Sequence, residues 1–283
     1  MEFSDRSTRY RSRQTCCDVT AIVWAYSRPR SALTLARLVF NRVRLILCRE
    51  PISQQFLEQT LHLQTPILLL PDLAFGLDHD SESSRNNVGP PQKIGVTVLD
   101  RGKQNTQFQQ QEQYEDALVT TLLHLHKTYG AEVHLFVQCY GPSPDQDDRR
   151  ITQRLYEQIH QTCNVVFVHD KFHDACTLKK AYAEMDFVIA TRMHTGIFAL
   201  SNGTPAILIS YQPKALGMVA MFGLDRYCLP IEVVTPIKLL ERTDEMVHQA
   251  QAMRQHITER WPLIHEQTQL WLQEIQNIKA VKI

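Results

Sequence analysis

The chain has 283 residues, of which 43% are hydrophobic and 21% are charged, and this is the composition of an ordinary globular protein. A chain of this length can form one large domain or two modest ones. Lysine plus arginine and aspartate plus glutamate both number 30, so no net charge recruits nucleic acid or a membrane surface.

Residues 1–30 form a polar, arginine-rich opening with one isolated apolar patch at 21–25. We expect this segment to be atypical, with disorder as one outcome, because it makes a poor helix or strand. It contains no uninterrupted apolar region before a cleavage site, so we predict no secretory signal. No stretch of the chain reaches the ~18 to 20 apolar residues of a transmembrane segment. Seven cysteines without a CxxC pair indicate free thiols and a cytoplasmic protein rather than a zinc site.

Residues 31–80 predict a small α/β region. Ser31–Arg42 has helical periodicity, with Leu35, Leu38 and Val39 on one face. Its arginines leave two interpretations, a basic amphipathic membrane helix or a solvated helix face beside a sheet, and we favour the second. The remaining elements are a strand at 44–48, a helix from Pro51 to about residue 61, and a strand at 66–70.

Residues 81–92 are rich in serine, asparagine and proline, which is the composition of a linker. We therefore place a domain boundary there and a second domain at 93–255. Its strands and helices alternate, which predicts a doubly wound parallel sheet. The expected strands are 94–99, 132–138, 165–168, 187–190 and 206–209, and the expected helices lie near 111–128, 148–162 and 174–184. Residues 235–279 are also predicted to be helical, with a break at Trp261–Pro262.

The most informative segment follows the strand at 187–190. Arg192-Met193-His194 comes directly after this strand, and a helix and the strand at 206–209 follow it. In such a βαβ unit the polar residues lie at the carboxyl end of a strand, where open α/β sheets bind ligands. A helix N-terminus favours an anion, an arginine can hold phosphate or carboxylate through two hydrogen bonds, and a histidine can donate a proton near neutral pH. The segment therefore predicts an anionic substrate and proton-transfer chemistry.

An ordered set of motifs carries a resemblance to a known family. Over roughly residues 35 to 255 the motifs resemble those of the polysaccharide pyruvyl transferase family. They are Cys48-Arg49-Glu50-Pro51-Ile52-Ser53, Pro71–Phe75, Arg192-Met193-His194, Gly203-Thr204-Pro205 and Tyr211–Gly217. The resemblance implies a GT-B-like α/β fold with Rossmann-like, doubly wound parallel sheets. It also implies an enzyme of cell-surface polysaccharide synthesis (an exopolysaccharide or a cell-wall glycan), which transfers a pyruvyl group from phosphoenolpyruvate to a sugar as a ketal.

Relative to this family, the chain lacks several βα units before Arg49. The resemblance therefore implies that 31–80 is a remnant of a truncated N-terminal Rossmann-like domain, and that 256–283 is a helix returning to it. A mis-assigned start, an upstream frameshift and a genuine short form all fit the sequence.

The resemblance also implies roles for residues at the ligand edge of the second domain. His194 would be the general acid, with a simple helix cap as the alternative. Arg192 would clamp the donor's phosphate or carboxylate, with a salt-bridged surface arginine as the alternative, and Met193 belongs to the same motif. Arg101 would bind donor phosphate, although its spacing departs from the family's by a residue or two. Lys214 would neutralise phosphate, or be an ordinary surface lysine.

A second set of residues is expected to bind the acceptor or to join the domains. Asp72 could orient an acceptor hydroxyl or act as a base, but an ion pair between domains is the favoured interpretation for Asp72 and Arg49. Tyr211 comes just after the strand that ends at Ser210, at the same ligand edge. The resemblance to GT-B enzymes implies that Glu232, after Pro230-Ile231, stands where such enzymes often hold the donor or the acceptor. The sequence requires no metal and no organic cofactor. His169-Asp170 with His173-Asp174 could suggest a metal site, but a loop and helix cap is favoured.

Two other functions stay open at this point. A nucleotide-sugar-dependent GT-B glycosyltransferase would use the same anion-binding device for a diphosphate. A truncated, non-catalytic remnant would bind an anion without turnover, or act beside a complete homologue. For the leading interpretation the partners are phosphoenolpyruvate and a sugar or glycan acceptor. A lipid-linked acceptor would bring the protein to the inner face of the membrane.

Overall fold

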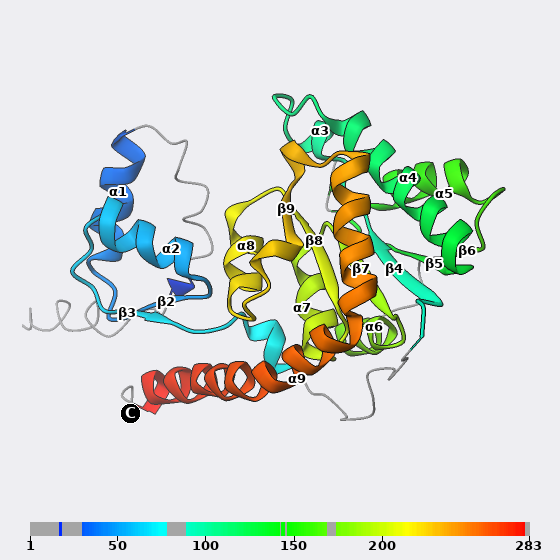
Figure 1. The fold of residues 1–283 in the computed structure, drawn as a ribbon. Coiled ribbons are helices and arrows are strands. Elements are labelled where there is room, and N and C mark those ends of the chain that lie inside the picture. Colours follow the sequence, from blue (N-terminus) through cyan, green and yellow to red (C-terminus); the bar gives the residue numbers. More distant parts are fainter. Residues whose placement is uncertain are drawn as a thin grey trace, which may run out of the picture. The chain divides into compact units, whose positions relative to one another are not determined.

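The computed structural model describes residues 17–18, 30–77, 89–141, 143–144, 146–168 and 174–280. The chain divides into two compact units (Figure 1). The smaller contains the chain up to Gly76 together with Leu263–Ile283, and the larger runs from Leu77 to Pro262. Most of the atypical opening at 1–30 and of the linker at 81–92 lies outside the described residues, as do His169, Asp170 and His173.

The smaller unit is built on three parallel strands in the order β1-β2-β3. Its strands are β1 (Cys17–Asp18), β2 (Ile46–Cys48) and β3 (Ile67–Leu69), and its helices before the linker are α1 (Arg30–Phe40), α2 (Pro51–Gln55), the π-helix η2 (Phe56–Thr60) and the 3-10 helix η3 (Leu73–Gly76). Glu50 caps α2, since its carboxylate accepts from the amides of Ile52 at 2.7 Å and Ser53 at 2.8 Å. Pro51 occupies the first helical position, where its missing N–H costs nothing.

The core of the smaller unit gathers apolar side chains from β2 and from the helix that follows it. The buried members are Ile46, Cys48, Phe56, Leu57 and Leu61, and Leu33, Ala36 and Phe40 of α1 pack against them. The face of α1 that the sequence singled out is exposed instead, with exposed fractions of 63% for Leu35, 50% for Leu38 and 49% for Val39. Helix α1 carries apolar residues on two neighbouring stripes, and the stripe of Leu33, Ala36 and Phe40 is the one that packs on this core.

The larger unit contains a sheet of six parallel strands in the order β6-β5-β4-β7-β8-β9. This confirms the predicted α/β fold with parallel sheets. The strands are β4 (Lys93–Thr97), β5 (Glu132–Phe136), β6 (Val165–Val168), β7 (Phe187–Ala190), β8 (Ala206–Ser210) and β9 (Cys228–Pro230). The helices are α3 (Arg101–Gln104), α4 (Gln111–Tyr129), α5 (Arg149–Ile159), α6 (Ala175–Ala183), α7 (Met193–Ser201), α8 (Pro213–Ala220), and the 3-10 helices η4 (Asp225–Tyr227) and η5 (Ile231–Val233).

The order of the strands separates the helices into two layers. The chain runs outward from β4 through β5 to β6, and then crosses back to β7, β8 and β9. Because such crossovers are right-handed, α4 and α5 cover one face and α6, α7 and α8 cover the other. In agreement, α4 packs against α5, and α7 packs against both α6 and α8 (Figure 1). Strands β7 and β8 are buried along their whole length, as expected for the centre of a parallel sheet.

The last helix, α9 (Pro236–Ala280), continues without a break through Pro262. The predicted break at Trp261–Pro262 is therefore wrong. A proline inside a helix removes one hydrogen bond and costs about 3 kcal/mol, but the turns on both sides are held by burial. Met253 and Ile257 are buried before the proline, and Ile264 and Trp271 are buried after it.

Among the described helices, none combines the length and the apolar character that crossing a bilayer requires.

Candidate functional site

The chain reverses its direction of travel across the sheet between β4 and β7. These two strands pair in parallel, with Thr97 opposite Ala190, although four described helices and two strands separate them in sequence. Ligands of open α/β sheets bind at such a switch point, outside the carboxyl ends of the strands. Arg101 follows the end of β4, and Arg192 follows the end of β7. The structure therefore places these two predicted donor ligands at the same edge.

The side chain of Arg192 is held by a buried carboxylate. Its Nε donates to Asp148 Oδ2 at 2.9 Å, and its Nη2 pairs with Asp148 Oδ1. The exposed fractions of the two side chains are 14% for Arg192 and 2% for Asp148. Burial alone would lower the pKa of Arg192, but its bonds to Asp148 raise the pKa above the ordinary value, so the guanidinium stays charged. The Nη1 atom donates to the hydroxyl of Tyr211 at 3.4 Å.

Asp148 is fixed from behind by the segment that follows β5. Its Oδ2 accepts from the amide of Cys139 at 3.1 Å, and its own amide donates to the carbonyl of Cys139 at 2.8 Å. The carboxylate thus has one face on the main chain and one on Arg192. In the described part of the chain these contacts leave one N–H on Nη1 and one on Nη2 of Arg192 for a ligand.

Buried hydroxyl groups hold the turn on both sides of Arg192. Tyr114 on α4 and Thr191 share a hydrogen bond of 2.7 Å between their hydroxyls. Gln138 Oε1, which follows β5, accepts from the hydroxyl of Tyr182 on α6 at 2.8 Å and from that of Thr195 on α7 at 3.1 Å. Burial raises the pKa of both tyrosines, so both phenols stay protonated and can donate. Helices α4 and α6 and the segment after β5 therefore hold the start of α7.

The start of α7 carries His194 and Met193. His194 is the second residue of this helix and is exposed, whereas the side chain of Met193 is only 6% exposed. Gly196 lets the helix lie close to the sheet, because a Cβ at this position would stand 2.8 Å from Cδ2 of Leu208 on β8. The motif thus presents a histidine on the first turn of a closely packed helix, while Met193 fixes that turn from the inside.

Arg101 differs from Arg192 in its partners. Its guanidinium carbon lies 5.3 Å from the centroid of the Tyr211 ring, in the geometry of a cation–π contact. Its Nε is buried and makes no hydrogen bond, and no ion pair engages the side chain within the described residues. Two guanidinium groups, one committed to a carboxylate and one not, therefore meet on one tyrosine.

Tyr211 is also part of the wall of a pocket at the carboxyl ends of β8 and β9. The pocket has a volume of about 360 Å³ and includes Glu232 of η5 in its lining. Lys214 lies in the first turn of α8 and is half-buried. The structure thus brings Arg101, Arg192 and Tyr211 together by direct contact, and adds Glu232 through the pocket.

Arg49 and Asp72 belong to the smaller unit and pair with each other. Nη1 of Arg49 lies 2.6 Å from Oδ2 of Asp72, and the other oxygen of Asp72 accepts from the amide of Ala74 at 2.9 Å. The pair connects the ends of two neighbouring strands, β2 and β3, inside one unit.

The histidine and aspartate cluster considered for a metal is described only at Asp174. That residue caps α6, since its carboxylate accepts from the amide of Thr177 at 2.8 Å. Among the residues that the structure describes, no three histidine, cysteine or acidic side chains gather as a metal ion would need.

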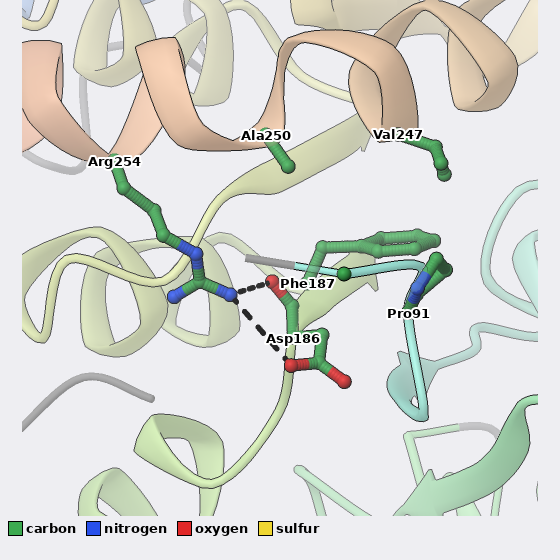
Figure 2. Close-up of a pocket in the computed structure, with 7 residues that line it drawn as sticks. Pro91, Asp186, Phe187, Val247, Ala250 and Arg254 are labelled. Atoms are coloured by element: carbon green, nitrogen blue, oxygen red, sulfur yellow. Dashed lines mark hydrogen bonds and ion pairs between the residues drawn. The ribbon is translucent and has the colours of Figure 1, made fainter. Parts of the chain in front are cut away.

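A second buried arginine lies at the opposite, amino-terminal edge of the sheet. Figure 2 shows Arg254 of α9 reaching the main-chain carbonyl of Asp186, which precedes β7. Oδ2 of the Asp186 carboxylate accepts from the amides of Gln92 at 2.7 Å and Lys93 at 2.9 Å, and Oδ1 lies 4.0 Å from Nη2 of Arg254. The cavity beside these residues measures about 10 Å³, which is the size of a single water molecule.

Sequence reasoning missed the partners that organise Arg192. Asp148, Gln138 and Thr195 were not singled out, and neither were Tyr114 and Tyr182. Thr195 was the one with a usable signal, because it follows the Arg192-Met193-His194 motif directly. Asp148, Gln138 and Tyr114 come from segments far away in sequence, and only the sheet order brings them to this edge. Tyr182 lies nearby, on the helix before β7, but nothing in its sequence context marked it.

Comparison with known proteins gives a family match. The model of the family described as polysaccharide pyruvyl transferase matches residues 20–213. The amylovoran biosynthesis protein AmsJ of Erwinia amylovora is 23% identical over 232 residues, which cover 79% of this chain and 56% of AmsJ. The chain therefore spans little more than half the length of this relative.

Solved structures resemble this chain at the level of the fold. The sucrose-phosphate synthase of Thermosynechococcus elongatus matches with a TM-score of 0.55 at 14% identity, over 90% of this chain and 63% of that one. The glycotransferase of kitacinnamycin matches with a TM-score of 0.51 at 13% identity, over 96% of this chain and 67% of that one. These likenesses confirm the predicted GT-B-like fold, and at such identities they carry nothing about the reaction.

Proposed function

The chain belongs to the polysaccharide pyruvyl transferase family, and on that premise we propose that it transfers a pyruvyl group from phosphoenolpyruvate to a sugar of a polysaccharide as a ketal. The observation that carries the proposal is the meeting of Arg101 and Arg192 on Tyr211, at the switch point of the sheet and beside the first turn of α7. The similarity to an amylovoran biosynthesis protein supports a glycan acceptor. In this proposal the acceptor is a free or a lipid-linked glycan.

Phosphoenolpyruvate carries a phosphate and a carboxylate, and the site offers two guanidinium groups in different environments to bind them. Arg101 has an unpaired charge with a buried, unbonded Nε, which favours binding of an anion in this corner. Arg192 offers the outer N–H groups of Nη1 and Nη2, because Asp148 occupies its other edge. The N-terminus of α7, with Met193 in its first turn, adds a partial positive charge. Lys214, in the first turn of α8, would add a further cation.

His194 is the proposed general acid. Its proton passes to the methylene carbon of phosphoenolpyruvate, which becomes a methyl group, and C2 becomes electrophilic. One sugar hydroxyl adds its oxygen to C2 and releases its proton. A second hydroxyl of the same sugar then forms the other C–O bond as phosphate leaves. The two hydroxyl protons balance the one taken up by carbon and the one that departs with phosphate. An exposed histidine on a fixed helix turn suits this proton delivery.

In this proposal Arg49 and Asp72 have a structural role. Their short ion pair occupies both side chains, so we assign them to holding the strand ends of the smaller unit. Tyr211 and Glu232 remain the proposed contacts with the acceptor.

The experiment that tests the proposal is calorimetric titration of the purified chain with phosphoenolpyruvate. Inorganic phosphate, pyruvate and a uridine diphosphate sugar serve as comparison ligands. We expect phosphoenolpyruvate to bind selectively, and Arg192→Ala to weaken it at least tenfold, which is about 1.4 kcal/mol. Preferential binding of the nucleotide sugar would favour a glycosyltransferase instead. A folded chain that binds none of these ligands would refute the proposal.

A further inference from the structure

The pocket at the ends of β8 and β9 has a volume of about 360 Å³, within the range of about 300–1,000 Å³ that is typical of small-molecule sites. Its lining comes from the two strand ends and the helices that follow them, α8 and η5. The lining residues are Ser210, Tyr211, Gln212, Pro213, Leu216, Cys228, Pro230 and Glu232. The pocket is therefore a built cavity at the ligand edge of the sheet, next to the two arginines.

Part of the lining of this pocket is apolar. Pro213, Leu216 and Pro230 supply hydrocarbon surface, and Leu216 is 38% exposed. Burial raises the pKa of the Cys228 thiol to about 11, so this side chain also stays neutral. The hydroxyl of Ser210 is used internally, since it donates to the carbonyl of Gln212 at 2.6 Å.

Other residues of the lining carry hydrogen-bonding groups with capacity left for a ligand. No hydrogen bond or ion pair engages the carboxylate of exposed Glu232 in the described part of the chain. The side chain of Gln212 makes no capping bond to α8. The hydroxyl of Tyr211 accepts from Arg192 and keeps its own proton to donate.

Tyr211 links this pocket to the two arginines. The guanidinium groups of Arg101 and Arg192 contact Tyr211 and favour an anion. Within the pocket, the carboxylate of Glu232 repels an anion and accepts from neutral hydroxyl groups. A ligand of the pocket therefore carries both hydroxyl groups and hydrocarbon surface. A pyranose ring has this pattern, because its C–H groups gather on one face and its hydroxyls at its rim.

We propose that this pocket binds the pyranose ring of the acceptor, with Glu232 and Gln212 holding its hydroxyls and Leu216 and Pro230 packing on its hydrocarbon face. The inference rests on the proposed function and deepens it, since it assigns the acceptor to the β8–β9 end of the site. Tyr211 then separates donor from acceptor and touches both.

The test uses the full chain labelled with 13C in its leucine methyl groups. The Leu216 signal is identified by its loss in Leu216→Met. The probes are methyl glycosides of neutral hexoses and N-acetylhexosamines, with uridine as a nucleoside probe, each titrated with and without saturating phosphoenolpyruvate. Glu232→Gln removes the charge at constant shape. Glu241→Gln, an exposed glutamate on α9, is the matched control.

We expect at least one glycoside to shift the Leu216 signal saturably, with an affinity in the millimolar range. Glu232→Gln should weaken this binding at least fivefold, and Glu241→Gln should leave it unchanged. The affinity for phosphoenolpyruvate should stay within twofold in both variants.

Three results would overturn the assignment of the pocket. They are no shift of Leu216 by any glycoside with or without the donor, a shift by uridine alone, and an equal loss of phosphoenolpyruvate affinity in Glu232→Gln. A failure of the proposed function is seen separately, as absence of phosphoenolpyruvate binding by the wild-type chain in calorimetry. Glycoside binding can therefore be scored whether or not the donor binds.

Discussion

The two edges of the six-stranded sheet each carry a buried arginine beside an aspartate, and the two pairs are built differently. At the carboxyl edge, Arg192 meets Asp148 through two parallel contacts, and its pKa is raised. At the amino edge, Arg254 donates to the main-chain carbonyl of Asp186, while its Nε and Nη1 have no hydrogen bond (Figure 2). Burial lowers the pKa of Arg254, and the carboxylate of Asp186, whose Oδ1 lies 4.0 Å from Nη2 of Arg254, opposes this only in part.

This difference indicates which of the two arginines is arranged to bind a ligand. Arg192 is held at a fixed angle, keeps N–H groups for a ligand and stands beside a cavity of ligand size. Arg254 has unsatisfied donors, but the cavity beside it has room for one water molecule. We therefore interpret Arg254 as a fastening of α9 to the sheet and Arg192 as part of the binding site.

The largest expected effect is the loss of the proton donor at the carboxyl edge. His194→Ala should lower the rate of phosphate release from phosphoenolpyruvate by about 10² to 10⁴, which is the usual contribution of a general acid. Stability should change little, because His194 is exposed. The rate is measured with a mixture of methyl pyranosides as acceptors. His248→Ala, at an exposed position on α9, is the control. Full turnover in His194→Ala would show that His194 is not the general acid.

The same substitution should destabilise the protein strongly at Arg192 and very little at Arg254. Arg192→Met leaves Asp148 as a buried carboxylate without a cation and should lower the free energy of unfolding by about 3–5 kcal/mol. Arg254→Met should change it by less than about 1 kcal/mol, because the loss of the bond to the Asp186 carbonyl is offset by the removal of two unsatisfied donors. Urea unfolding measures both. Equal losses would abolish the distinction between the edges.

A weaker effect is expected from Asp148 through Arg192. Asp148→Asn keeps the shape of the side chain but turns an amide N–H toward the guanidinium, so Arg192 should lose its fixed angle. The dissociation constant for phosphoenolpyruvate should rise about tenfold, with a smaller loss of rate at saturating donor. Asp186→Asn at the amino edge should leave donor binding unchanged. A drop in kcat with unaltered affinity in Asp148→Asn would argue against a positioning role.

The smallest effect concerns His134 on β5, whose Nε2 lies 2.5 Å from Oε1 of Glu132. Burial lowers the pKa of His134, and Glu132 opposes this. In the unfolded chain, His134 has its ordinary pKa of about 6.5, so as the pH falls the unfolded state takes up a proton before the folded state does. The contribution of His134 to the free energy of unfolding is therefore present above that pH and is lost as the pH falls. Urea midpoints at pH 7.5 and 5.5 should therefore differ less in His134→Gln than in the wild-type chain. An identical difference in both proteins would mean that another group titrates.

Much of the larger unit was predictable because its elements have strong local signals. The boundaries expected for β6 and β7 are those observed, and α4 extends one residue beyond its expected end. The strand β9 was missed, because three residues ending in proline carry no periodic pattern. The end of that short strand forms part of the pocket, so the proposed acceptor site was invisible as a unit even though Tyr211 and Glu232 had been singled out.

The position of the candidate site was predictable, but its internal pairing was not. Polar residues after buried strands pointed to the edge where Arg101 and Arg192 stand. The partner of Arg192 lies 44 residues away in sequence, in a stretch that contains several aspartates. Only the approach of that loop to the end of β7 distinguishes Asp148 from its neighbours, and this depends on the order of the strands.

The continuity of α9 has a consequence for how the protein is made. The indole N–H of Trp271 donates to the carbonyl of Pro71, 200 residues earlier, and Trp271 forms a cluster with Leu47 and Leu70. During translation, the whole of the larger unit is synthesised before this tryptophan is added to the chain. The unit that begins first therefore completes its core last. Until then its apolar surface is open to chaperones, and a stop codon soon after Pro262 would harm the beginning of the protein more than its middle.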